Sequence, residues 1–395
     1  MTDALRRLHA DIGALAPDIT SRAGEIEALR QIPSDLVETL RSIGVFRLFV
    51  PRSLGGLELD LPAALGVIEA LAKIDGSIGW TVMISNGGSL FRPSLPPETY
   101  ARIYRDGPDV ITAGSTQPAG TAEAEGDGWR VTGRWPFASG CRHADWIVGF
   151  CVVTEGGKPL PGPNGDGGPP LIRGFLLPAS DWEIEDTWRV AGLKGTGSHH
   201  IAVKDKLVSE ANFFDPGGSF RCHPGPLYQA VLQFLPLLLG AVTVGIAEGA
   251  LDDLVALAGS GRQQFRAAVP MRESEIFQYE LGRIAADVKA AKAMLETQAA
   301  SHWRHALAGT LKDEALITEA SHAAVWVAAT CTRAADACFA VAGSSSVYET
   351  SPLQRRLRDC HVASQHGLAQ QRLYVGAGKQ MLNSADSMKA RSESR

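Results

Sequence analysis

The spacing of apolar residues changes period twice along this chain, and those two changes constrain its fold more than any single motif. Up to about residue 104, apolar residues recur at the three- and four-residue intervals of helices. Between residues 110 and 208, short alternating runs are separated by Gly, Pro and Asp, which is typical of strands. After Pro226 the helical spacing returns. We therefore predict an α+β protein in which a β-rich part lies between two helical parts.

The predicted elements give each part its architecture. In the first part, helical spacing covers residues 1–30, 34–42, 61–74, 75–93 and 97–104. The predicted strands, which suggest a small β-barrel or a sandwich, are 110–113, 129–133, 146–153, 171–177, 182–186 and 200–208. The last predicted helices, whose short connections favour an antiparallel four-helix bundle, are 226–259, 271–308, 313–342 and 349–382. We predict a helical domain over 1–109, a β domain over 110–215 and a bundle domain over 216–395.

Composition narrows the environment and the partners. The 395 residues carry a formal net charge of −5, which gives no reason to expect nucleic acid. The six cysteines form no CxxC pair, so we expect neither a zinc site nor a disulfide framework, and a reduced, cytoplasmic protein. The N-terminus has no apolar stretch of the kind found in signal peptides. The longest apolar run, 14 residues from Phe234 to Ala247, is too short to span a bilayer and suits a buried helix, so we expect no membrane partner.

One mid-chain segment has the residues of a ligand-binding strand, namely Gly133-Arg-Trp-Pro-Phe-Ala-Ser-Gly140. Small residues let a planar ligand lie close to the backbone. The Ser139 hydroxyl and nearby backbone N–H groups can hydrogen-bond the edge of a ring, and an apolar strand follows that would hold this edge rigid. From these residues alone, a hairpin corner with a turn serine remains an alternative.

This segment resembles the flavin-edge strand of the acyl-CoA dehydrogenase superfamily. It is closer to the branch of two-component flavin-dependent monooxygenases, which take reduced flavin from a separate reductase. The resemblance assigns Ser139 to flavin N5 and places Phe137 and Ala138 at the flavin. It extends over nearly the whole chain, for instance to the turns Leu54-Gly-Gly56 and Gly195-Thr-Gly-Ser198. It implies a helical domain, a small β-barrel and a four-helix bundle in that order.

The resemblance assigns further cofactor contacts. Ser115 and Gln117 would contact the pyrimidine edge of the flavin, with Gln117 replacing an acidic residue of the dehydrogenases. Arg262 and Phe265 match an Arg-x-x-Phe motif whose arginine reaches a flavin phosphate across a subunit interface. The other cofactor contacts in this assignment are Gly343, Ser344 and Gln365. On the residues alone, a polar loop at 113–121 and a solvated Arg262 are the alternatives.

The string that indicates the chemistry is Gln365-His366-Gly367, which follows Arg358-Asp359. The dehydrogenases have Tyr-Glu-Gly here, and their glutamate removes an α-proton from an acyl thioester. The monooxygenase branch has the histidine. A near-neutral imidazole can donate or accept a proton, so we expect His366 and Ser139 to be the catalytic residues. The tandem His199-His200 would point to opposite faces of a strand, and we predict no metal site.

The substrate side departs from the family pattern. Several hydroxylases of this branch have a second histidine on the helix after Gly-Trp, but the helix after Gly79-Trp80 has none. Trp80, Asn86 and Ser89 are the candidate substrate contacts. Small residues here suggest room for a bicyclic or indolic ring.

Together, the resemblance implies a monooxygenase that hydroxylates an aromatic or heteroaromatic small molecule through a flavin C4a-hydroperoxide. Its cofactors would be FADH2 or FMNH2 and O2, with reduced flavin from a separate reductase. The family also implies at least a dimer and usually a homotetramer. The alternatives are an acyl-CoA dehydrogenase with its base at Glu248, an N- or S-oxygenase of the same fold, and a non-catalytic flavin-fold subunit.

Overall fold

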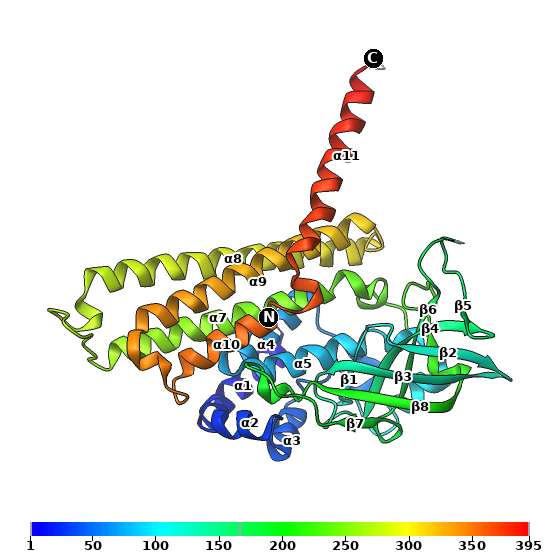
Figure 1. The fold of residues 1–395 in the computed structure, drawn as a ribbon, viewed down its shortest axis with the longest axis horizontal. Helices are drawn as coiled ribbons and strands as arrows, with labels where there is room; N and C mark the ends of the chain where they lie inside the picture. Colours follow the sequence, from blue (N-terminus) through cyan, green and yellow to red (C-terminus); the bar gives the residue numbers. More distant parts are fainter. Residues whose placement is uncertain (1, 166, 394–395) are drawn as a thin grey trace. The chain divides into compact units, whose positions relative to one another are not determined.

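A computed structural model describes residues 2–165 and 167–393, shown in Figure 1. Contacts within the chain group it into two compact units. The first unit comprises the residues up to Asp60, then Trp80–Val190 and Lys194–Val231. The second unit comprises Leu61–Gly79, Ala191–Leu193 and the residues from Leu232 onward. The three domains expected from the sequence divide the chain differently, and their boundaries stay a prediction.

The helices of the first unit begin and end where the sequence supplies caps. The stretch expected to be helical over 1–30 forms two helices, α1 (Asp3–Ser21) and α2 (Ala23–Leu29), separated at Arg22. The Thr2 hydroxyl caps α1 by accepting the Leu5 N–H at 3.3 Å. The other helices of this unit are α3 (Ser34–Ser42), α6 (Pro97–Ile103) and, from Trp80 onward, α5 (Gly76–Ser89).

The central β region is a nine-stranded mixed sheet with the order β7-β8-β3-β2-β4-β6-β9, and β1 and β5 both pair with β4. Its strands are β1 (Thr112–Gly114), β2 (Gly120–Glu125), β3 (Gly128–Ala138), β4 (Trp146–Glu155), β5 (Lys158–Pro159), β6 (Ile172–Pro178), β7 (Glu183–Glu185), β8 (His199–Ser209) and β9 (Phe213–Phe214). Each predicted strand overlaps one of these. The predicted strands do not include β2, β5 or β9. In β2 the glutamates hide the alternation; this strand pairs with β3 antiparallel and with β4 parallel.

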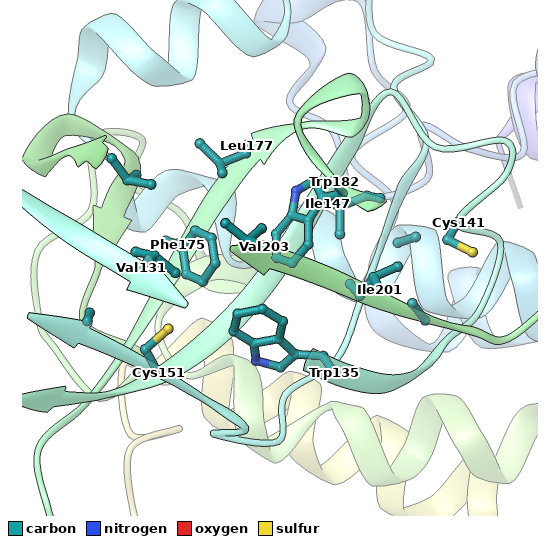
Figure 2. Packing of buried hydrophobic residues seen from close by; sticks show 14 of the residues in the cluster. Val131, Trp135, Cys141, Ile147, Cys151, Phe175, Leu177, Trp182, Ile201 and Val203 are labelled. Atoms are coloured by element: carbon teal, nitrogen blue, oxygen red, sulfur yellow. The ribbon is translucent and has the colours of Figure 1, made fainter. Parts of the chain in front are cut away.

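The core of the sheet is built around Trp135, which is fully buried. Its indole N–H donates to the Phe150 carbonyl at 2.7 Å. Figure 2 shows its ring beside those of Phe175 and Trp182, with ring centroids 5.7 and 5.2 Å away. The neighbouring strands make room for the indole with glycine, because a Cβ built on Gly120 or Gly133 would lie within 2.5 Å of it.

In the second unit, helices pack along one another. α4 (Leu61–Ile74) lies against α7 (Leu235–Gly259), and α9 (Glu314–Ala342) contacts both α7 and α8 (Glu275–Ala308). The prediction of one continuous helix over 349–382 is wrong, because this region is interrupted. α10 (Pro352–Ala363) is followed by two short 3-10 turns before α11 (Tyr374–Glu393) begins, and α11 extends away from the other helices of this unit (Figure 1).

In the part of the chain that the structure describes, two helical stretches are long and apolar enough to cross a bilayer, namely Val231–Gly259 and Ala315–Val347. The first contains the apolar run noted in the sequence, within a helix that is longer than that run. Most of its apolar window, 83%, is buried inside the protein, and for the second stretch the figure is 50%. Burial in the core therefore accounts for the composition of α7.

The middle of α10 carries a buried carboxylate. Asp359 is 2% exposed, and one of its oxygens accepts the Leu193 backbone N–H at 2.6 Å. Burial is the main cause that raises the pKa of Asp359 from 3.8 to about 7, and the nearby Asp75 carboxylate raises it further. Asp75 in turn accepts the N–H groups of Ser77 and Ile78 at the start of α5.

We predict that Gly133→Ala destabilises the protein by roughly 1–3 kcal/mol, because the added methyl group overpacks the Trp135 pocket. The midpoint of urea unfolding measures this effect. The matched control is Gly13→Ala in α1, where a Cβ meets nothing within 4 Å and removal of a mid-helix glycine favours the helix. Equal unfolding midpoints for the two variants would contradict the packing described here.

We predict that Asp359 makes the protein less stable as pH rises from about 4 to 7. In this window the unfolded chain releases the proton while the folded protein retains it, so unfolding becomes more favourable. Asp359→Asn keeps an acceptor for Leu193 and removes the titration. Between pH 4.5 and 7.5 the free energy of unfolding should decrease less in this variant than in the wild type. The difference between the two decreases should be on the order of 2–4 kcal/mol. The exposed substitution Asp127→Asn should follow the wild type.

Candidate functional site

The end of β3 contains a bulge that exposes one aromatic ring. The pairing register with β8 shifts between Trp135 and Ala138. Within the bulge, Phe137 has φ 64°, a left-handed conformation that costs free energy for an aromatic residue and often marks a functional position. Its ring is 58% exposed and meets the ring of Trp188 edge-on, with centroids 6.3 Å apart. The bulge therefore presents a flat apolar ring beside the small residue Ala138.

Two residues further on, Ser139 turns inward and is only 4% exposed. Its hydroxyl accepts the indole N–H of Trp80 at 3.0 Å and lies 2.7 Å from the Ser198 hydroxyl. Its backbone N–H donates to the Phe137 carbonyl at 2.9 Å. The structure thus brings the predicted catalytic serine together with Trp80, which was expected on the substrate side.

The other predicted contacts on the sheet follow β1. Ser115 is nearly buried, and its backbone N–H donates to the Val148 carbonyl at 3.2 Å. Its hydroxyl accepts the Gln117 backbone N–H at 3.4 Å, while the Gln117 side chain is exposed. A polar edge therefore runs beside β4, the strand that follows the Ser139 turn.

Two of the expected substrate contacts are committed elsewhere. Asn86 is fully buried; its amide accepts the Leu48 N–H and donates to the carbonyls of Val45 and Val82. The buried Ser89 hydroxyl donates to the Asn86 carbonyl at 2.6 Å. Because these bonds secure α5 to the segment that follows α3, we remove both residues from the proposed substrate contacts and keep Trp80.

His366 lies in the interruption between α10 and α11. Its extended backbone caps a 3-10 turn, and its Nδ1 accepts the Leu368 N–H at 3.2 Å. An accepting Nδ1 places the proton of the neutral ring on Nε2. Burial lowers the pKa of His366, so the ring is neutral at pH 7. Gln365 is exposed, and its carbonyl accepts the side-chain amide of Gln370.

The remaining cofactor candidates lie on two adjacent loops of the second unit. The amide of Gln264, next to Phe265, donates to the Val341 carbonyl at 2.8 Å, which joins the loop after α7 to the last turn of α9. Arg262 lies at the base of the first loop, and Phe265 is 89% exposed. Gly343 has φ 69° where α9 ends, and Ser344 next to it is exposed.

Glu248, the carboxylate that a dehydrogenase alternative would use as its base, is held by a lysine. Lys292 Nζ lies 3.0 Å from the Glu248 carboxylate and also donates to Glu69. Lys292 therefore joins both carboxylates in one ion-pair cluster. Among the described residues, no group of three His, Cys, Asp or Glu side chains could hold a metal ion.

The hydroxyl contacts that Thr196 and Ser198 make were not predicted from the sequence. The Gly195-Thr-Gly-Ser198 string was noted only as a motif, but both hydroxyls are buried and 2.6 Å apart, behind Ser139. The ordinary signal for such a pair, a hydroxyl flanking a tight glycine, does not reveal its partner, because Ser139 lies 59 positions away.

These features fit a planar flavin. The exposed Phe137 ring, the small residues at 138 and 140 and a serine that can both donate and accept match a flat ring with a polar edge. The conformation at Phe137 has a cost that binding would explain.

Comparisons with known proteins identify the family of this chain. The family model of the acyl-CoA dehydrogenase N-terminal domain matches residues 11–92, and that of the C-terminal domain matches residues 237–371. Indole-3-acetate monooxygenase of Acinetobacter baumannii is 32% identical over 90% of this chain and 89% of its own. The enzyme of the same name from Pseudomonas putida is 33% identical over 91% of this chain and 89% of its own.

Solved structures give the same result. The HsaA monooxygenase from M. tuberculosis superposes with a TM-score of 0.87 at 27% identity, covering 97% of this chain and 98% of its own. XiaF from Streptomyces sp., in complex with FADH2 and glycerol, gives 0.86 at 25% identity, covering 95% and 96%. The fold and monooxygenase class expected from the sequence are confirmed: this chain belongs to the flavin-dependent monooxygenases of the acyl-CoA dehydrogenase superfamily, as an oxygenase component.

Proposed function

We propose that this protein hydroxylates an aromatic or heteroaromatic small molecule, with reduced flavin supplied by a separate reductase and O2 as the oxidant. The relatives named for indole-3-acetate and the FADH2 complex of a structural neighbour support this substrate class and cofactor. An indolic ring is the first choice of substrate. FADH2 and FMNH2 are both compatible with the site.

The observation that carries the proposal is the neutral imidazole of His366 where a dehydrogenase of this superfamily needs a carboxylate. A ring protonated on Nε2 donates a hydrogen bond without first being charged. Removal of a proton from carbon needs a free base instead, and the Glu248 carboxylate is engaged by Lys292. The pattern therefore favours oxygen transfer over dehydrogenation.

The cofactor and the residues of the proposed site would have separate roles. Reduced flavin, when bound, would supply the two electrons that activate O2, and O2 would supply the oxygen atom that is transferred. Phe137 would offer an apolar face to the flavin ring, and Ser139 would bind its N5 edge, with Ala138, Ser115 and Gln117 alongside. Trp80 fixes the Ser139 hydroxyl. His366 would hold a proton at Nε2 for the reacting oxygen.

Assembly belongs to the proposal as well. We propose a cytoplasmic homotetramer in which Arg262, Phe265, Gly343, Ser344 and Gln365 complete a flavin site. The exposure of Phe265 and of large apolar side chains on the same unit supports contacts between subunits. Examples of such side chains are Ile276, Tyr279 and Tyr348.

The function is tested by mixing the protein with reduced FAD or FMN in oxygenated buffer and measuring hydroxylated product, oxygen consumed and hydrogen peroxide released. We expect indole-3-acetate or a phenol to give at least one product carrying one added oxygen atom. Oxidation of the flavin that yields only hydrogen peroxide with every indole and phenol, together with reduction of tightly bound FAD by an acyl-CoA, would replace the proposal by dehydrogenase activity.

We predict that His366→Asn lowers the yield of product per reduced flavin by about tenfold or more, within the range of proton-transfer groups. Asparagine preserves the cap on the Leu368 N–H but lacks the Nε2 proton donor. In the wild type, yield should fall only on acidification below about pH 6.5, because the pKa of His366 is lowered from that ordinary value. Protonation then takes place at Nδ1 and removes the acceptor of the Leu368 N–H, which positions the ring.

The matched control is His305→Asn near the end of α8, which should leave both the yield and its pH profile unchanged. A pH profile of His366→Asn that keeps the acid limb of the wild type would show that another group titrates.

A further inference from the structure

A pocket of about 740 Å³ lies in the first unit, and its lining contains none of the residues assigned to the flavin. It is bounded by the segment that runs from α6 to β1, by the start of β4 and by the ends of β6 and β8. Its volume is within the range of about 300–1,000 Å³ that is common for small-molecule sites. The pocket is therefore large enough for a ligand of its own.

The carboxylates that line this pocket already have cationic partners. These ion pairs, with their N–O distances, are Arg41–Asp145 (3.0 Å), Arg47–Asp109 (3.0 Å), Lys206–Asp181 (2.8 Å) and Arg105–Asp106 (3.5 Å). Arg102 also lines the pocket, and it forms no ion pair with any of the described residues. Its charge is therefore available to an anion from solution.

Uncharged groups hold Arg102 in place. Its guanidinium carbon lies 5.5 Å from the centre of the Trp146 ring, and its Nη2 donates to the side-chain oxygen of Asn212 at 3.4 Å. Trp146 and Asn212 are 8% and 6% exposed, and the Asn212 amide donates in turn to the Leu176 carbonyl at 2.6 Å. The other N–H groups of Arg102 have no acceptor among the described residues. Such a planar fork can bind both oxygens of a carboxylate.

A second arginine without a carboxylate partner lies behind the wall of the pocket. Arg92 is fully buried and donates to the Tyr104 hydroxyl at 2.8 Å and to the carbonyl of Val110, a lining residue, at 2.9 Å. It too forms no ion pair within the part of the chain that the structure describes. Because buried charges are screened weakly, its positive charge adds to the attraction that an anion in the pocket would feel.

Apolar side chains complete the wall, among them Leu177, Leu207 and Val208. An arginine fork beside an apolar wall suits a ligand that joins a carboxylate to a flat ring better than it suits an inorganic anion. We propose that this pocket is a second ligand site, which binds a small aromatic or heteroaromatic carboxylate through Arg102. This inference goes beyond the proposed function and does not depend on it.

The test is a calorimetric titration of the full-length protein with indole-3-acetate, and with indole-3-acetamide as its uncharged analogue. Arg102→Gln should weaken the binding of indole-3-acetate to this pocket by about tenfold or more, which is typical for the loss of a hydrogen bond to a charged group. The amide should bind with the same affinity to this variant and to the wild type. Arg102→Lys keeps the charge without the fork and should lose less than Arg102→Gln. The matched control is Arg7→Gln, an exposed position on α1, which should leave both affinities unchanged.

The number of molecules bound per chain separates this site from the catalytic site. If both sites take indole-3-acetate, the wild type should bind two molecules and Arg102→Gln one at concentrations that saturate only the tighter sites. One molecule in the wild type and none in the variant would support the second site and count against indole-3-acetate as the substrate.

Three results would overturn the second site. The first is equal binding of indole-3-acetate by the wild type and Arg102→Gln. The second is an equal loss for the acid and the amide, because the variant would then act through shape and not through charge. The third is displacement of indole-3-acetate from the Arg102-dependent site by an equal concentration of inorganic phosphate, which would show that the pocket does not recognise the ring.

Discussion

The packing of Trp135 is the interaction on which the flavin-edge strand depends. The indole occupies space that exists only because Gly120 and Gly133 lack side chains, and its N–H is bonded to the Phe150 carbonyl. With that residue fixed, the register shift immediately after it gives Phe137 its left-handed backbone and exposed ring, and turns Ser139 inward. A strained conformation persists only where the surrounding structure holds it, and a large buried aromatic two positions away is what holds it here.

Much of the fold was predictable because the elements that define it have strong periodicity. The predicted helix over 61–74 has the bounds observed for α4, and each predicted strand is present. β2 was not predicted because alanine alternates with glutamate along it, so no large apolar residue marks its buried face. Ala122 is buried in the core but is too small to give a strong signal. Periodicity reports burial on one face, so a strand whose buried residues are small gives a weak signal.

The site was only partly predictable from the sequence. Ser139 and His366 came from a resemblance, and neither position could have been assigned a role from spacing. The interruption of the last helix around His366 has no proline to mark it; the histidine ring itself caps the next turn through Leu368. Asn86 and Ser89 were reasonable polar candidates, but a sequence does not say whether a buried amide faces a ligand or the backbone. The partners of Ser139 lie far along the chain, beyond local reasoning.

The groups around Ser139 are neutral, whereas several carboxylates lie in the second unit. In the second unit, the carboxylates Glu69 and Glu248 share Lys292, and Asp359 is buried with a pKa raised to about 7. Around Ser139, the nearest polar partners are an indole and two hydroxyls, which are uncharged at any ordinary pH. Neutral donors of this kind can hold a proton in place without attracting water as strongly as a charge does. A reaction that fails when water or stray protons enter therefore gains more from such surroundings than one that needs a strong base, and this is the physical reason that oxygen transfer suits these residues.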